Sequence, residues 1–236
     1  MERVLEAFTR EVQELYGTDL VAVVLYGSAA AGEHVAGASD INVAVIVRQL
    51  SPALLRRARG RIRAWHRQGF ATPLFFDLET IQHSLDVFPI EFLDMQERHR
   101  ILWGPDLLTP LRIGRGNLRL QCEQELRGKL LRLRQAYVES AGSPEHLRQV
   151  LLMAAGSLLV LLRTLLRLAG ADPGGPAEAV LERAGGRFAT STSHLVQVYR
   201  VKRGEIRLAG SAVDALFQGV LEEVEGLVRV VDGLAA

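Results

Sequence analysis

The sequence contains a single cysteine, almost no net charge and no signal for secretion. Cys122 is the one cysteine, which excludes an intramolecular disulfide and a cysteine-based zinc site and suits a reducing cytoplasm. The formal net charge is +1, so no overall field attracts the chain to nucleic acid or to a membrane surface. The first 15 residues (MERVLEAFTREVQEL) are charged from the second position and lack a secretory apolar segment. We therefore expect a cytoplasmic protein.

Long hydrophobic runs are also missing. The longest, residues 150–162, is interrupted by Ser157 and followed by Arg163 and Arg167. It is shorter than the roughly 20 apolar residues that a membrane-spanning helix needs. The run therefore predicts a buried helix of a bundle, and we expect no membrane as a partner.

Two common nucleotide-binding patterns do not occur in the chain. Neither G-x-G-x-x-G nor G-K-[ST] is present, which disfavours a Rossmann or P-loop site. The histidines lack the H-x-x-x-H spacing of a metal site. If the protein binds nucleotides, it does so through a glycine turn of neither the Rossmann nor the P-loop type.

Length and composition are those of a globular protein with one large domain or two modest ones. Apolar residues make up 48% and charged residues 23% of the 236 positions. A stretch rich in glycine and proline, residues 104–117, predicts a domain boundary. We expect a first domain at 1–104, a linker at 105–117 and a helical domain at 118–236.

Hydrophobic periodicity predicts α/β structure in the first part and helices alone in the second. Helices are expected at 2–16 and 52–68, strands at 21–26, 41–47, 73–78 and 88–95, and a short helix or turn at 79–85. The second part predicts helices at 118–139, 143–168, 176–184 and 190–201, and a last one opened by a capping box at Ser211. The helix at 52–68 is rich in arginine, typical of a solvated surface, although a phosphate or nucleic-acid contact stays open.

The segment 21–47 holds the strongest functional signal. Gly27 and Ser28 break a β-branched apolar run, and a second such run follows Asp40 directly. A glycine turn after a strand exposes backbone N–H groups that suit a phosphate. Asp40 and Asn42 lie two residues apart, so in a strand they face the same side. An acid there, opposite a phosphate-binding turn, is suited to hold Mg²⁺.

This pattern resembles the signature of the nucleotidyltransferase fold, the DNA polymerase β-like superfamily, written G-S-x-x-x-G followed by S-D-[IL]-D. The matching residues are Gly27, Ser28, Gly32, Ser39 and Asp40. The departure is Asn42, which stands where the pattern has its second acid. The resemblance implies nucleotide binding by Gly27, Ser28, Gly32 and Ser39, and a mixed sheet. The alternative is a tight turn in which Ser39 or Asp40 caps a helix.

The superfamily carries a third carboxylate on a later strand, and this chain offers three candidates. Residues 88–95 (FPIEFLDM) place Glu91 in the middle of an expected strand, where burying an acid is costly without a cation or another partner. The resemblance therefore implies Glu91 as a metal ligand or as the base, with Asp77 and Asp94 as rivals. An acid on an edge strand facing water is the remaining interpretation.

The order of domains resembles the kanamycin nucleotidyltransferase-like type, in which a helical bundle shapes the acceptor site and often forms a dimer. The resemblance implies transfer of a nucleoside monophosphate from a nucleoside triphosphate to an unidentified hydroxyl acceptor, with Mg²⁺ held by Asp40, Asn42 and Glu91. A homodimer is then among the expected partners, and nucleic acid is disfavoured without being excluded. Because Asn42 supplies no charge, the alternative is a catalytically impaired nucleotide-binding or toxin–antitoxin-type module.

Overall fold

The computed structural model describes residues 1–32 and 40–234. The chain forms two compact units, Met1–Gly114 and Arg115–Ala236. The division falls inside the stretch 105–117 that we predicted as a linker. Most of that stretch packs on the first unit, because Leu108 is buried and Gln96 donates to the carbonyls of Leu108, Thr109 and Leu111.

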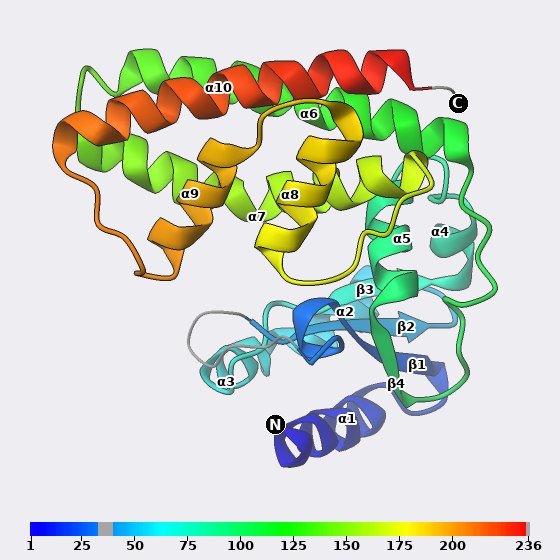
Figure 1. Ribbon diagram of the computed structural model, residues 1–236. Coiled ribbons are helices and arrows are strands. Elements are labelled where there is room, and N and C mark those ends of the chain that lie inside the picture. The colour runs from blue at the N-terminus through cyan, green and yellow to red at the C-terminus, as the bar shows by residue number, and fades with distance from the viewer. Residues whose placement is uncertain (33–39, 235–236) are drawn as a thin grey trace. The chain divides into compact units, whose positions relative to one another are not determined.

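A four-stranded mixed sheet forms the centre of the first unit (Figure 1). Its strands are β1 (Leu20–Tyr26), β2 (Asn42–Val47), β3 (Leu74–Asp77) and β4 (His99–Trp103). The order is β3-β2-β1-β4, with β1 antiparallel to both neighbours and β2 parallel to β3. The predicted mixed sheet is confirmed, and so are the strands at 21–26, 41–47 and 73–78 to within a residue or two at each end.

Helices cover both faces of this sheet. The helices are α1 (Glu2–Tyr16), α2 (Pro52–Arg59), α3 (Ile62–Arg67), α4 (Leu78–Gln82) and α5 (Pro89–Glu97), with single turns η1 (Gly17–Asp19) and η2 (Gly27–Ala29). The first three share a core with Val43 and Val45 of β2, whereas Ile81 of α4 and Phe92 of α5 share a core with Ala44. The expected helix 52–68 is two helices, because Gly60, a poor helix former, ends the first.

The strand predicted at 88–95 is wrong, because this segment forms α5. Pro89 occupies the first helical turn, where its missing N–H costs nothing. Phe92 and Met95, three residues apart, are both buried on the helix face that meets the sheet. The strand β4 follows directly and ends at Trp103, just before Gly104. A Cβ at Gly104 would lie 2.2 Å from the Val21 carbonyl oxygen, so only glycine fits there.

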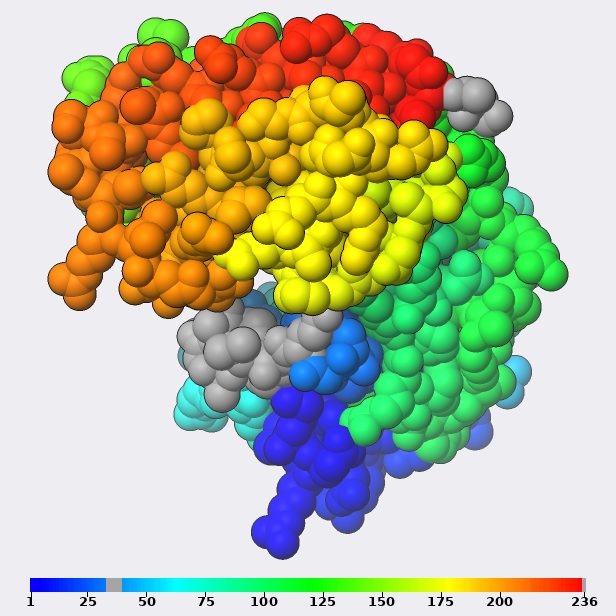
Figure 2. Space-filling view, viewed as in Figure 1, coloured from blue at the N-terminus to red at the C-terminus, as the bar shows by residue number. Residues whose placement is uncertain are grey.

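The second unit is a five-helix bundle. Its helices are α6 (Arg115–Glu139), α7 (Pro144–Leu168), α8 (Ala177–Phe188), α9 (Ser193–Lys202) and α10 (Gly210–Gly233). The expected helices are confirmed, but the last one begins at Gly210 after Ala209, which makes no side-chain cap bond, so the predicted capping box at Ser211 is wrong. Figure 2 shows α8, α9 and α10, coloured yellow to red, closing one side of the bundle.

The helix α7 lies at the centre of this bundle. By length and composition it is apolar enough to cross a membrane, and half of its most apolar window is buried inside the unit. It packs against α6, α8, α9 and α10. These contacts agree with the prediction of a buried bundle helix.

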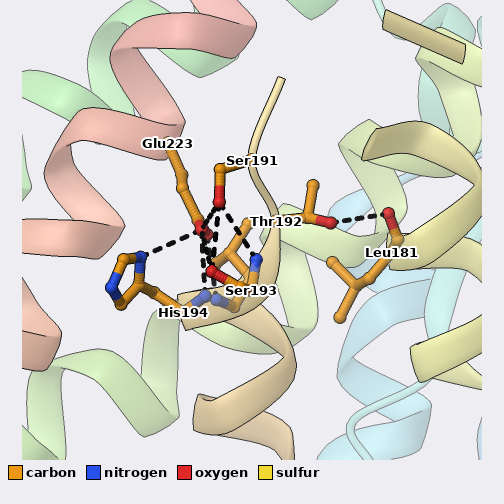
Figure 3. A network of polar contacts seen from close by, with 7 residues as sticks. Leu181, Ser191, Thr192, Ser193, His194 and Glu223 are labelled. Carbon is orange, nitrogen blue, oxygen red and sulfur yellow. Dashed lines mark hydrogen bonds and ion pairs between the residues drawn. The ribbon is translucent and has the colours of Figure 1, made fainter. Parts of the chain in front are cut away.

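A buried carboxylate joins α9 to α10 (Figure 3). Glu223 of α10 is 3% exposed, and its two oxygens accept the N–H groups of His194 and Leu195 at 2.9 Å. Its Oε1 also accepts the Ser191 hydroxyl at 2.7 Å and lies 3.0 Å from Nδ1 of His194. The first N–H groups of a helix have no partner within it, so Glu223 caps α9 from another helix. Gly219 permits this approach, since a Cβ there would lie 2.5 Å from the His194 ring.

We expect Glu223→Ala to lower the free energy of unfolding by about 3 kcal/mol, because it removes a buried charge acceptor from several donors. Urea unfolding followed by far-ultraviolet circular dichroism measures the loss. The control is Glu222→Ala on the exposed neighbouring position, which should change the stability by less than about 0.5 kcal/mol. Equal losses in the two variants would contradict the capping role.

Candidate functional site

The glycine turn after β1 is held firmly against the start of β2. Gly27 has φ 74°, a conformation that favours glycine, and its N–H donates to the Arg98 carbonyl at 2.9 Å. Its own carbonyl accepts the N–H groups of Ala30 and Ala31 at 3.1 Å. A Cβ on Gly27 would lie 3.5 Å from Nδ2 of Asn42. The turn that we predicted to bind phosphate is therefore in direct proximity to Asn42.

Asn42 begins β2 and lies opposite Tyr26, the last residue of β1. Its side chain is half-buried, and it shares a sheet face with Ala44 and Ile46, the face that α4 and α5 cover. Asp40 precedes the strand and is exposed. The sequence-predicted Asp40 and Asn42 thus lie at the same end of the sheet as the Gly27 turn.

The remaining predicted nucleotide-binding residues lie on the turn itself or beyond it. Ser28 is half-buried within η2. Gly32 is exposed, with φ 74°. Ser39 lies outside the described residues.

The strand next to β2 brings no acid to this end of the sheet. Ile41 bridges to Phe70, and Ala44 pairs with Leu74 in the parallel register. Residues 70–76 read FATPLFF, so no carboxylate accompanies Asn42 on that side. The acid of β3, Asp77, pairs with Val47 at the opposite end of β2.

Asp77 has a structural role at that far end. Its side chain caps α4 by accepting the Thr80 N–H at 2.8 Å, and it accepts the Leu50 N–H at 2.9 Å. Hydrogen bonds from the Thr80 side chain and from the Leu50 and Thr80 backbones lower the pKa of Asp77. Of the two rivals to Glu91, Asp77 is therefore remote from the candidate site.

The other two carboxylates, Glu91 and Asp94, lie on α5. Glu91 is exposed in the first turn, whereas Asp94 is partly buried in the last turn, with Oδ1 3.9 Å from Nε of Arg98. Burial raises the pKa of Tyr26 to about 12, and the negative charge of Asp94 contributes to the rise. The sequence signal for this helix was Pro89 at its start, and Asp94 lies one helical turn before Arg98.

The donors at this end of the sheet suit a hard cation but carry little charge. Within residues 1–32 and 40–234, no three His, Cys, Asp or Glu side chains form a group that could hold a metal ion. Asp40 offers a carboxylate, and Asn42 offers an amide oxygen, which are ligands that Mg²⁺ accepts. The residues fit a Mg²⁺ ion bound together with the oxygens of a phosphate, rather than an ion held by the protein alone.

Comparison with known proteins identifies the fold. No family model and no curated protein matches the sequence. Among solved structures, the chain is similar to the spectinomycin adenyltransferase AAD(9) from Enterococcus faecialis, crystallised with ATP and spectinomycin. The TM-score is 0.59 at 11% identity, over 95% of this chain and 99% of the other. The predicted nucleotidyltransferase fold, with its mixed sheet and helical C-terminal part, is confirmed.

We expect Asp77→Ala to lower the free energy of unfolding by about 1 kcal/mol at neutral pH, because it removes the cap of α4. The pKa of Asp77 is lowered in the folded protein. The stabilisation by the ionised cap is therefore fully present above the usual Asp pKa of about 3.9, and it is lost as the pH falls through the pKa of Asp77 in the folded protein. Urea unfolding at about pH 7 and about pH 3 should therefore show a smaller difference at the lower pH. Asp86→Ala, at an exposed position of the same unit, serves as the control. A difference that grows on acidification would be inconsistent with the cap.

Proposed function

We propose that this protein binds a nucleoside triphosphate together with Mg²⁺ at the turn between β1 and β2, and transfers the nucleoside monophosphate to a hydroxyl acceptor. The observation that carries the proposal is the approach of Gly27 to Asn42, with Asp40 two residues earlier at the same end of the sheet. The proposal is supported by the similarity in fold, over 95% of this chain, to an adenyltransferase that was crystallised with ATP.

The phosphate contacts are assigned to the residues that follow Gly27. The Gly27 N–H is already bonded to the Arg98 carbonyl, so it holds the turn in shape. Ser28 offers its hydroxyl and its backbone N–H to the β- and γ-phosphates, and the absence of a side chain at Gly27 lets them approach. Gly32 and Ser39 are proposed to complete this contact, as the resemblance implies.

The metal contacts are assigned to Asp40 and Asn42. Bound Mg²⁺ supplies neutralisation of the charge that the transferred group and the leaving pyrophosphate carry. The Asp40 carboxylate provides the charged ligand, and the Asn42 amide oxygen orients the ion without adding charge. The exposed Glu91 at the start of α5 is proposed as a further metal ligand or as the base for the acceptor hydroxyl, as the resemblance implies.

Transfer of this kind depends on position more than on covalent help from the protein. The acceptor oxygen must lie in line with the leaving pyrophosphate, which requires both substrates to be held rigidly. The acceptor class is a compound with a free hydroxyl group.

The second candidate function is nucleotide binding without transfer. It is favoured by the low charge of the site, since Asn42 replaces an acid and residues 70–76 of the neighbouring segment hold none. A site with fewer carboxylates binds Mg²⁺ more weakly and stabilises the transition state less. Such a protein would bind a nucleotide and change its interaction with another protein as a result.

We expect isothermal titration to detect binding of at least one of ATP, GTP, CTP and UTP that requires Mg²⁺. Asp40→Ala should weaken this binding by about tenfold or more, since even supporting residues of metal sites contribute that much. Asn42→Asp should lower the Mg²⁺ concentration that nucleotide binding requires, because it adds a charged ligand. The control is Asp86→Asn, at an exposed acid of the same unit, which should leave the affinity unchanged.

Release of pyrophosphate with a panel of hydroxyl acceptors separates the two candidate functions. Release by the wild type supports transfer. Binding without release, with release appearing only in Asn42→Asp, supports the second function. A wild type that binds no triphosphate would refute both.

A further inference from the structure

The nearly neutral net charge of the chain is unevenly distributed. From residue 41 to residue 76 the sequence contains seven arginines and no aspartate or glutamate. Six of these arginines lie on α2, on α3 or in the turn between the two helices, at positions 56, 57, 59, 61, 63 and 67. The first unit therefore carries a concentrated positive charge in a protein whose overall field is weak.

The buried and the charged side chains of α2 and α3 lie on opposite faces. Leu54, Ala58 and Trp65 are buried and share a core with residues of α1 and β2. Their spacing of four and seven residues is that of one helix face. The turn between the helices keeps helical backbone angles, with φ −70° and ψ −16° at Gly60, so one periodicity extends through both helices. Four exposed arginines recur on the outer side at intervals of three, four and four residues, and we call them the arginine face: Arg56, Arg59, Arg63 and Arg67.

Two further arginines flank this face and are held by acids. Arg57 pairs with Asp19 at 3.1 Å, and Arg61 pairs with Glu11 at 3.1 Å. These ion pairs join the segment to η1 and α1, which gives the flanking arginines a structural role. Within residues 1–32 and 40–234, the arginine face makes no such ion pair.

Helix stability does not account for the arginine face. Like charges three or four residues apart on a helix repel each other, at a cost of about 0.2–0.5 kcal/mol per pair. The face contains three such intervals, and neither helix carries an acid opposite in sign except Glu79 and later residues beyond them. The helix dipole favours the arginines at the end of each helix, but it disfavours Arg63 in the first turn of α3.

We propose that the arginine face binds the phosphate backbone of a nucleic acid. Guanidinium groups stay charged and form paired hydrogen bonds with phosphate oxygens. From Arg56 to Arg67 the face extends about 16 Å along the helices, and a duplex presents one phosphate charge per about 1.7 Å of its axis, so several phosphates lie within reach at once. Trp65 is fully buried and cannot stack on a base, so the binding is independent of sequence. The inference goes beyond the proposed function and does not depend on it.

A membrane surface suits this segment less well. A helix that binds a membrane exposes an apolar face beside its basic one. Here the apolar face of α2 and α3 is buried in the protein core, and on these two helices, both fully described, Leu55 is the one large apolar side chain that is exposed. The charge of the arginine face therefore acts without an apolar anchor.

The test measures the binding of labelled duplex DNA and of labelled single-stranded RNA by fluorescence anisotropy at several salt concentrations. If the four arginines neutralise four phosphates, the slope of log K against log salt concentration is about −3.6 on the duplex and about −2.8 on the single strand. Arg56→Gln together with Arg63→Gln should reduce the slope by about half. The matched control, Arg57→Gln with Arg61→Gln, removes the same charge from the same segment and should keep most of the slope, because these two charges are already paired.

Three results would overturn the inference. The first is a wild type that binds neither nucleic acid at about 50 mM salt. The second is an equal loss in the two double variants, once thermal melting shows that both are folded, since net charge alone would then explain the binding. The third is binding to phosphatidylserine vesicles without binding to nucleic acid, which identifies a membrane partner. Titration with triphosphates is unaffected by any of these results, so the proposed function is tested separately.

Discussion

The hydrogen bond from the Gly27 N–H to the Arg98 carbonyl connects the three parts from which the candidate site is built. It joins the turn after β1 to the segment between α5 and β4, and it holds Gly27 where a Cβ would lie 3.5 Å from Asn42. The bond restrains the turn at Gly27, and a restrained turn would lose less conformational freedom on binding a ligand, which favours affinity.

Charge is the second constraint on this site. A sheet in which β2 and β3 run parallel places equivalent ends of neighbouring strands together, so an acid near residue 72 would have lain beside Asn42. The chain instead places its β3 acid, Asp77, at the far end, where it caps α4. The other two candidate carboxylates, Glu91 and Asp94, belong to α5, whose buried Phe92 and Met95 pack in the same core as Ala44.

The sequence predicted the strands of the sheet well and α5 badly, for a physical reason. The runs of valine and isoleucine at β1 and β2 are β-branched and buried on both faces, so few other structures suit them. Residues 88–95 are too short to separate the two periods, because Ile90 and Phe92 alternate while Phe92 and Met95 have helical spacing. The same error moves Glu91 from the middle of an expected strand to the exposed first turn of a helix, and its assignment to the metal stays a prediction.

In the helical unit, the lengths of helices followed from local signals, but their contacts did not. Ser143 and Pro144 marked the start of α7, and its leucine pattern marked its burial. Glu223 carried no such signal, because its partners His194 and Leu195 lie 29 and 28 residues away along the chain and are joined only by tertiary packing. Such contacts are set by the packing of helices rather than by a motif, which is why the sequence predicted where these helices lie but not the buried contacts that join them.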